Sequence, residues 1–478
     1  MAIVSQQAGR PGRWVELGLL ALAIGIGLYA YVQVGLATTG EVPSGVFTQL
    51  GVLVVLAVLT HVVLRWRAPY ADPVILPTAV ALNGLGLAMI YRIDQAEGTS
   101  FASRQVMWTM LGVAAAVAVV VLLRDHRQLR RYTYLSMILG LVMLLLPLVP
   151  GLGATINGAR IWISLGGLSF QPAELAKVLL AIFFAGYLVT NRDTLALAGP
   201  KVLGLQLPRA RDLGPILLAW GVALVVLVFQ RDLGTALLFF ALFVAMLYVA
   251  TERLSWVLIG LLLFGGGAAL AAATLDHVGA RFDVWLNALD PDIYNRAFGG
   301  SYQVVQGLFG MASGGLMGTG WGQGRPEIVP YAHSDFIIAS LAEELGLTGL
   351  LAILLMYLVL VERGMRAAIG VRDGFGTLLA SGLSFVVAFQ CFVVVGGVTR
   401  LIPLTGLTMP FLAQGGSSLV VNWMIVALLL RISDAARRPA AMSGELPIPP
   451  LDTSGEVAEV TFRPTGDDAN PTEVVRLS

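Results

Sequence analysis

Long apolar stretches alternate with short polar segments along the chain as far as about residue 438. A helix that crosses a lipid bilayer needs about 20 mostly apolar residues. The pattern therefore predicts an all-α polytopic membrane protein with about twelve transmembrane helices. The twelve stretches lie at approximately 15–34, 47–65, 73–91, 105–123, 132–150, 173–190, 214–230, 233–250, 255–275, 336–361, 377–397 and 407–431. Only Gln230, Arg231 and Asp232 separate the seventh from the eighth, so one broken element is the alternative there.

Composition supports this interpretation, because the chain is 57% hydrophobic and only 12% charged over its 478 residues. Soluble domains carry about 25% charged residues. So few charged residues leave too little polar surface for a protein that faces water on all sides. The single cysteine, Cys391, lies in an apolar stretch, which excludes an internal disulfide and a cysteine-based metal cluster. We expect it to be a small buried apolar side chain.

The distribution of basic residues predicts the orientation, since short cytoplasmic loops are enriched in Lys and Arg. With the N-terminus inside, nineteen basic residues fall in inner segments and eight in outer segments. The inner ones are Arg10, Arg13, Arg65, Arg67, Arg124, Arg127, Arg130, Arg131, Arg192, Lys201, Arg209, Arg211, Arg253, Arg363, Arg366, Arg372, Arg431, Arg437 and Arg438. The outer ones are Arg92, Arg104, Arg160, Arg231, Arg281, Arg296, Arg325 and Arg400. This asymmetry predicts an even number of spans, both termini in the cytoplasm, and two long outer loops at about 151–172 and 276–335.

Charged residues at the edges of spans require a partner or a water-filled cavity. Glu174 and Lys177 open the sixth span three residues apart, so they can pair on one helix face. The pair is either a structural ion pair or the charged wall of an outward-opening cavity. Asp232 either caps the eighth helix or lines that same cavity.

The outer loops offer further candidate residues. Pro403 and Pro410 interrupt the segment 399–418, which predicts irregular backbone that is tolerated at membrane depth only in protein or facing water. Asp290 with Pro291 is either a simple turn signal or part of a site. Charged residues of the large loop include Arg281, Asp283, Asp290, Asp292, Arg296, Arg325, Glu327, His333 and Asp335. Their spacing does not indicate a metal site.

Six stretches together resemble the SEDS family of shape, elongation, division and sporulation proteins (RodA/FtsW/SpoVE). They occur in family order within about 73–431. They are NGARIWISLGGLSFQPAELAK (157–177), QRDLGTALL (230–238), SYQVVQG (301–307), SGGLMGTGWGQG (313–324), AHSDFIIASLAEELGLTG (332–349) and RLIPLTGLTMPFLAQGGSS (400–418). Two additional N-terminal spans are similar to those of the twelve-span elongation proteins of actinobacteria, whereas the usual core has ten.

The resemblance implies a division of the chain into three parts. Residues 1–72 would be an N-terminal tail with two extra transmembrane helices, and residues 73–438 the glycosyltransferase membrane core. Residues 439–478 are polar, rich in Pro, Ser, Asp and Glu, and expected to be a disordered cytoplasmic tail.

The resemblance also implies an activity, a substrate and a partner. Family members are inverting peptidoglycan glycosyltransferases that polymerise lipid II, an undecaprenyl-pyrophosphate-linked disaccharide-pentapeptide, at the outer face of the cytoplasmic membrane. They work with a class B penicillin-binding protein, a transpeptidase, and with other elongation or division machinery. The elongation role is preferred. The alternatives are the division branch with the same chemistry, a lipid II flippase, and a non-catalytic scaffold.

The family places an essential aspartate ahead of a Gly-Tyr-Gln motif. In this chain Asp290 keeps the Asp-Pro pair and is the predicted catalytic base, with Asp292 as the second choice. Such a base contributes about 10²–10⁴-fold. The leaving pyrophosphate needs cations. The predicted substrate-binding residues are Glu174, Lys177, Arg160, Asp232, Arg231, Arg400 and Gln303. A divalent cation, Mg²⁺ or Mn²⁺, could share the charge of the pyrophosphate.

Overall fold

The computed structural model describes residues 13–439, apart from 157–158, 166–167, 197–200, 203–204, 207–213 and 298. Most of the predicted C-terminal tail, and Arg10, Arg209 and Arg211 of the predicted inner segments, lie outside the described residues. The structure is mainly helical, as the apolar pattern predicts.

Eleven helices of the described ranges are long and apolar enough to cross a membrane, counting a 3₁₀-helix with the α-helix that continues it. They run between two ends of the bundle, one of which carries most of the arginines. They are α1 (Arg13–Thr39), α2 (Val46–Arg67), α3 (Ile75–Glu97), α4 (Phe101–Leu122), η1 with α5 (His126–Tyr132 and Thr133–Leu145), α6 (Pro172–Ala196), α8 (Leu233–Thr251), α9 (Leu254–Thr274), α13 (Ile337–Gly370), α14 (Gly374–Val398) and α15 (Gly416–Arg437). Helices α6 and α8 both begin at the other end, because the shorter α7 (Gly214–Val225) returns the chain between them.

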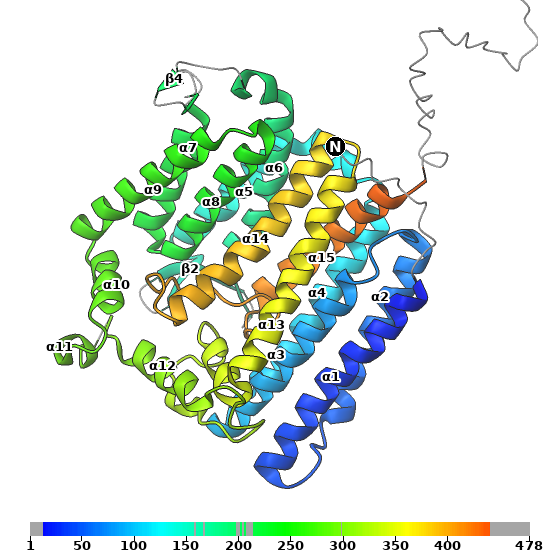
Figure 1. Cartoon of the computed structure of the whole chain (residues 1–478), viewed down its shortest axis with the longest axis vertical. Helices are drawn as coiled ribbons and strands as arrows, with labels where there is room; N and C mark the ends of the chain where they lie inside the picture. The colour runs from blue at the N-terminus through cyan, green and yellow to red at the C-terminus, as the bar shows by residue number, and fades with distance from the viewer. Residues whose placement is uncertain are drawn as a thin grey trace, which may run out of the picture. The chain divides into compact units, whose positions relative to one another are not determined.

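Shorter elements connect these helices. They are η2 (Leu146–Leu148), β1 (Gly153–Ile156), β2 (Ala159–Leu165), β3 (Leu168–Phe170), β4 (Lys201–Val202), β5 (Leu205–Gln206), α7 (Gly214–Val225), the π-helical η4 (Val226–Gln230), α10 (Asp276–Leu286), α11 (Pro291–Tyr294), α12 (Tyr302–Gly314) and η5 (Pro326–Ile328). The large outer loop is therefore mostly a series of short helices. Its four-residue α11 stands between α10 and α12 (Figure 1).

The predicted spans differ from the observed helices in two places. The seventh span is a 12-residue α-helix, α7, that continues as the π-helix η4, so it is shorter than a regular spanning helix. The last span begins at Gly416 rather than near residue 407, because the chain before it follows an irregular path. The structure also adds to the predicted all-α fold a two-stranded sheet of β4 and β5 and a sheet of three strands.

The three-stranded sheet forms in the first outer loop, where β1, β2 and β3 pair in antiparallel order. Gly153 faces Ile163 across the first pair, and Ile163 faces Phe170 across the second. The central strand reads Ala-Arg-Ile-Trp-Ile-Ser-Leu, and its β-branched and aromatic residues favour extended backbone. The sheet leads directly into α6 and so fixes where that helix begins.

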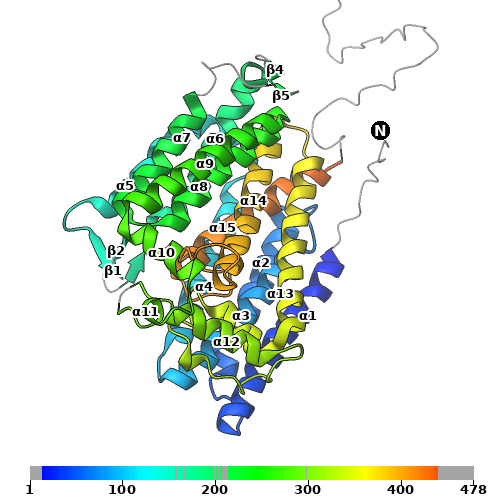
Figure 2. The same ribbon diagram turned by 60° about the vertical axis from the view of Figure 1, so that its left-hand side comes forward.

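Helix packing divides the bundle into two groups (Figures 1 and 2). One group contains α1–α4, α13 and α15, in which α3 packs against α1 and α13, and α4 packs against α15 and α2. The other contains α5–α9, and α6 and α14 contact each other to join the groups. Burial is highest for central helices and lowest at the periphery. Of the most apolar 18-residue stretch of each helix, 94% is buried in α3 and 17% in the peripheral α9. Cys391 is buried in α14, as predicted.

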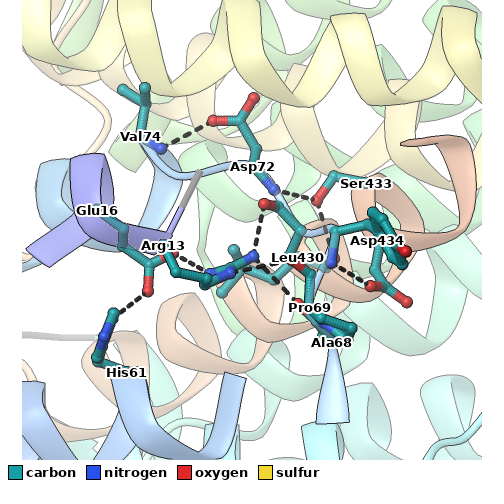
Figure 3. A network of polar contacts seen from close by, with 12 residues as sticks. Arg13, Glu16, His61, Ala68, Pro69, Asp72, Val74, Leu430, Ser433 and Asp434 are labelled. Atoms are coloured by element: carbon teal, nitrogen blue, oxygen red, sulfur yellow. Dashed lines mark hydrogen bonds and ion pairs between the residues drawn. The ribbon is translucent and has the colours of Figure 1, made fainter. Parts of the chain in front are cut away.

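A polar network locks the two additional N-terminal helices to the rest of the bundle at its arginine-rich end (Figure 3). Arg13 of α1 pairs with Glu16 and donates hydrogen bonds to the carbonyls of Ala68 and Ala71, at 3.1 and 2.7 Å. His61 of α2 lies 2.7 Å from the other oxygen of Glu16. Because these groups are buried, each needs such a partner. The network thus fixes α1 and α2 against the start of α3.

The same network reaches the end of the last helix. The backbone N–H of Tyr70 donates to Asp434 of α15 at 2.9 Å, and that of Asp72 donates to Ser433 at 3.0 Å. Asp72 also pairs with Arg437. The first and last helices are therefore held together through the connection between α2 and α3 (Figure 3).

A glycine kink in α13 shapes the opposite end of the bundle. Gly346 has φ 68° and ψ −175°, a conformation that side chains disfavour. A Cβ atom there would lie only 2.2 Å from the backbone nitrogen of Gly318. The kink frees the carbonyls of Glu343 and Glu344, which accept hydrogen bonds from Thr319 and Gly320 of the preceding loop, at 3.0 and 2.9 Å.

We expect Gly346→Ala to lower the melting temperature of the detergent-solubilised chain. The left-handed backbone alone costs about 1–2 kcal/mol for a residue with a side chain, and the contact with Gly318 adds to this. Gly51→Ala is the matched control, because a Cβ at this position of α2 meets open space. Equal melting temperatures for the two variants would contradict the proposed role of Gly346.

Candidate functional site

A buried ion pair lies at the start of α6, at the end of the bundle opposite the arginine-rich end. Lys177 Nζ lies 2.5 Å from Glu174 Oε2, and the two side chains are 1% and 6% exposed. This confirms the predicted pairing. Pro172 occupies the first turn of α6, where a missing N–H costs nothing. Lys177 also donates to the side-chain oxygen of Gln390 on α14 at 3.0 Å, so the pair connects two helices.

Asp232 forms the second part of the site. Its carboxylate accepts hydrogen bonds from the backbone N–H and the hydroxyl of Thr235, at 2.9 and 2.6 Å, and so caps α8 as predicted. The carboxylate is buried, and Glu174 and Arg281 both act on it electrostatically. The structure thus shows the capping role, and the cavity-lining role stays a prediction. The adjacent Arg231 has φ 58° and is exposed to solvent, away from this buried carboxylate.

Arg281 of α10 brings a cation to the same place. Its Nη1 donates to the carbonyl oxygen of Leu404 at 2.8 Å. Burial lowers the pKa of Arg281, while the negative charges of Asp232 and Asp335 act against that change. The guanidinium of Arg281 therefore lies close enough to two acidic side chains from different elements to interact with both electrostatically.

Asp335 lies in the connection that leads into α13. Burial raises the pKa of this carboxyl group, and the hydroxyl of Ser334 (2.7 Å) and the charge of Arg281 oppose the rise. Glu174, Asp232 and Asp335 thus contribute three acidic groups to the cluster, and Lys177 and Arg281 contribute two cations. We call these five residues the charged cluster.

An irregular segment, 401–415, passes between the helices beside the charged cluster. It has no regular secondary structure, as its two prolines predict. Gln390 donates to the carbonyl of Thr408 at 2.8 Å, and Arg281 binds that of Leu404. Tyr357 of α13 donates to the carbonyl of Pro410. Side chains of the surrounding helices therefore satisfy backbone groups of this segment, as irregular chain at membrane depth requires.

Arg400 joins α10 to the end of α14. Its Nη2 donates to the carbonyl of Trp285 at 2.7 Å, and the indole N–H of Trp285 donates back to the carbonyl of Arg400 at 3.0 Å. Arg400 has φ 59°, so its backbone also turns sharply here. These contacts give the predicted substrate-binding arginine a structural role, because they position α10 and hence Arg281.

Asp290 occupies a different environment from the charged cluster. It caps the short helix α11, and its carboxylate accepts a hydrogen bond from the backbone N–H of Asp292 at 2.9 Å. Both aspartates are exposed. The carboxylate of Asp290 can therefore contact a substrate without first breaking a buried ion pair. The hydrogen bond from Asp292 fixes the orientation of this side chain. Asp290 therefore forms the turn that the Asp-Pro pair predicts. Its role as catalytic base stays a prediction.

Two other predicted residues lie outside the charged cluster. Gln303 of α12 donates to the carbonyl of Pro330 at 3.0 Å and so ties α12 to the loop before α13. Arg160 of β2 donates to the carbonyl of Val149 at 3.2 Å. Both side chains use these hydrogen bonds to hold nearby backbone, at the same end of the bundle as the charged cluster.

Three residues of the site were not selected from the sequence. Arg281 and Asp335 were noted only among the charges of the large loop, and Gln390 not at all. A glutamine within an apolar span is itself a signal, since it must find a buried polar partner. The distance in sequence between Lys177 and Gln390 explains why no local pattern pointed to their contact.

No group of three or more His, Cys, Asp or Glu side chains in the described ranges is arranged to hold a metal ion. A divalent cation that arrives with a pyrophosphate is a different case, because the substrate then supplies oxygen ligands. The divalent cation therefore stays a prediction.

The family model of the FtsW, RodA and SpoVE proteins, described as "Cell cycle protein", matches residues 74–438. The chain belongs to this family. The RodA proteins of Mycobacterium tuberculosis and Mycobacterium leprae, both named peptidoglycan glycosyltransferase, are 51% and 48% identical to it. These matches cover 79% and 84% of this chain and 81% and 85% of the relatives.

More distant relatives include the division branch of the family. A probable peptidoglycan glycosyltransferase FtsW of Geobacter metallireducens is 34% identical over 76% of this chain and 94% of its own length. A solved peptidoglycan synthase complex, described as coordinating polymerization and crosslinking, contains a chain with the same fold. The TM-score is 0.60 at 24% identity, with 77% of this chain and 98% of that chain covered.

Proposed function

We propose that this chain is a peptidoglycan glycosyltransferase of the RodA type, which polymerises lipid II into glycan strands for cell elongation. About half of the aligned residues are identical to those of two mycobacterial proteins named peptidoglycan glycosyltransferase RodA. The observation that carries the proposal is the charged cluster, which places buried cations beside an irregular segment at the end of the bundle that also holds the exposed Asp290. That combination suits a sugar acceptor and an anionic leaving group.

In the proposed reaction, the hydroxyl oxygen of the acceptor sugar attacks the anomeric carbon of the donor. Asp290 removes the hydroxyl proton as general base. The bond between the anomeric carbon and the pyrophosphate breaks, and its electron pair leaves with the lipid pyrophosphate. Attack opposite the leaving group inverts the configuration from an α-linked donor to a β-linked polymer.

Cations stabilise the charge that develops on the leaving group. Lys177 and Arg281 are the proposed contacts to the pyrophosphate, because both are held in place by neighbouring polar groups. Glu174, Asp232 and Asp335 keep these cations oriented before substrate binds. An Mg²⁺ or Mn²⁺ ion carried by the substrate would add further charge neutralisation, so EDTA is expected to slow the reaction.

The proposed location is the cytoplasmic membrane, with the arginine-rich end and both termini in the cytoplasm. This places the charged cluster and Asp290 on the outer side. The proposed partner is a class B penicillin-binding protein, whose transpeptidase activity would crosslink the strand that this chain makes. The coordination of polymerization and crosslinking reported for a protein of the same fold supports this choice.

We predict that Arg281→Gln lowers kcat/KM for lipid II by about 10- to 100-fold, because a charge-assisted hydrogen bond contributes about 1.5–3 kcal/mol. Steady-state polymerisation at several lipid II concentrations measures this effect. Arg296→Gln is the control, since this exposed arginine of the same outer loop pairs with Asp283 at 3.3 Å. An unchanged kcat/KM would contradict the proposed contact between Arg281 and the pyrophosphate.

A lipid II flippase is the alternative that a direct assay can separate from the polymerase. Vesicles that contain the full chain and fluorescent lipid II report translocation between leaflets, while the same sample is analysed for polymer. The proposal predicts polymer without accelerated translocation. Rapid translocation in the absence of polymer, with the partner present, would overturn it.

A further inference from the structure

An apolar groove lies between α2 and α4 on the outside of the bundle. Its volume is about 420 Å³, and all its lining side chains are aliphatic. Ala114 and Ala118 of α4 keep it deep, whereas Leu56 and Leu59 of α2 form the facing wall. The family model begins at residue 74, after α2. The groove therefore depends on a helix outside the matched family core.

Arginines surround the end of this groove that lies toward the arginine-rich end of the bundle. Arg67, the last residue of α2, donates to the carbonyl of Val121, a lining residue, at 2.7 Å. Its Nε is buried and makes no hydrogen bond within the described chain. Arg124, two residues after the end of α4, is exposed. Arg65 lies over the ring of Trp14 of α1, on the face of α2 that points away from the groove. No carboxylate of the described residues forms an ion pair with any of these three arginines.

Aromatic residues mark the same level as a membrane–water boundary. Trp66 and Trp14 are each 72% exposed. Arg67 lies 4.9 Å from the Trp66 ring, and Arg65 lies 5.2 Å from the Trp14 ring. Exposed tryptophans with basic neighbours are typical of the boundary between the acyl chains and the headgroups. A ligand in the groove would thus have its tail in the hydrocarbon region and its head beside the arginines.

We propose that this groove binds an anionic phospholipid, with an acyl chain between α2 and α4 and the phosphate at Arg67 and Arg124. Basic pockets beside spanning helices bind anionic headgroups, and each nearby basic residue strengthens binding about fivefold. Asp125, next to Arg124, is half exposed and leaves a net charge of +1 for Arg67, Arg124 and Asp125.

This assignment places the lipid in the cytoplasmic leaflet, which rests on the orientation given under the proposed function. The chemistry of the groove does not depend on that orientation. Binding can be measured in detergent without lipid II, so failure of this proposal leaves the polymerase proposal unaffected, and the reverse also holds.

The test is native mass spectrometry of the full chain, purified in detergent and titrated with phosphatidylglycerol or phosphatidylcholine. We expect the wild type to bind phosphatidylglycerol at least fivefold more tightly. Arg124→Gln weakens phosphatidylglycerol binding about fivefold and leaves phosphatidylcholine binding unchanged. Arg192→Gln, which removes an exposed arginine paired with Glu252, is the charge-matched control.

A second pair of variants tests the groove itself. Ala118→Leu fills the groove from an exposed position of α4 and is expected to weaken the binding of both lipids. Ala269→Leu makes the same change at an exposed position of α9 and is expected to have no effect. Equal affinity of the wild type for the two lipids would overturn the headgroup assignment. Unchanged binding by Ala118→Leu would overturn the groove as the site, and a partner helix would become its next candidate occupant.

Discussion

Asp290→Asn is expected to reduce lipid II polymerisation by about 10²–10⁴-fold, the usual contribution of a general base. Asparagine keeps the oxygen that accepts the hydrogen bond from Asp292 and is as good a helix cap as aspartate. The change therefore removes the negative charge and the proton acceptor while preserving the turn. The rate of glycan formation by purified protein, with its melting temperature measured in parallel, checks this expectation.

Two matched variants make the result specific. Asp276→Asn removes another exposed carboxylate from the same outer loop, in the first turn of α10, and should polymerise at the wild-type rate. Asp292→Asn tests the second choice for the base. If Asp290→Asn retains full activity and Asp292→Asn loses it, the proton acceptor is Asp292, two residues along the same short helix.

Lys177→Met is expected to destabilise the chain by about 3–5 kcal/mol, because it leaves the buried carboxylate of Glu174 without its partner. Methionine is similar in length to lysine, so the loss of stability reflects the missing charge rather than a change in side-chain volume. The free energy of unfolding in detergent measures the effect. Polymerisation should also be lost, since the proposed mechanism uses this cation at the pyrophosphate.

The double variant Lys177→Met/Glu174→Gln separates these two consequences. Removing both charges avoids the unpaired buried carboxylate, so most of the stability should return. Activity should stay low, because no cation replaces Lys177. If activity returns together with stability, the pair serves only to hold α6 in place, which is the structural alternative for these residues.

The apolar pattern was sufficient to predict most of the fold, because the bilayer fixes the length of each helix. It was less informative for α7, where the chain changes from an α-helix to a π-helix within one apolar stretch. It also misplaced the start of α15, since residues 407–415 are apolar yet lie in the irregular segment. Hydropathy reports burial in apolar surroundings and does not distinguish helix from extended chain.

The candidate site was only partly predictable for a related reason. Glu174, Lys177 and Asp232 are conspicuous because a charge in an apolar stretch needs a local explanation. Arg281 and Asp335 lie in a loop that is rich in charges, so nothing in the sequence separates them from their neighbours. Their place in the charged cluster depends on how α10 and the start of α13 pack beside the irregular segment, which is tertiary information.

The most direct test of the central claim is gel analysis of the product that the full-length chain makes from lipid II, with and without a class B penicillin-binding protein. The account predicts that the wild type, with the partner present, forms a ladder of glycan polymer that a muramidase degrades. The Asp290→Asn sample should show no such ladder. A ladder of equal intensity from Asp290→Asn, or no polymer from the wild type with its partner, would contradict it.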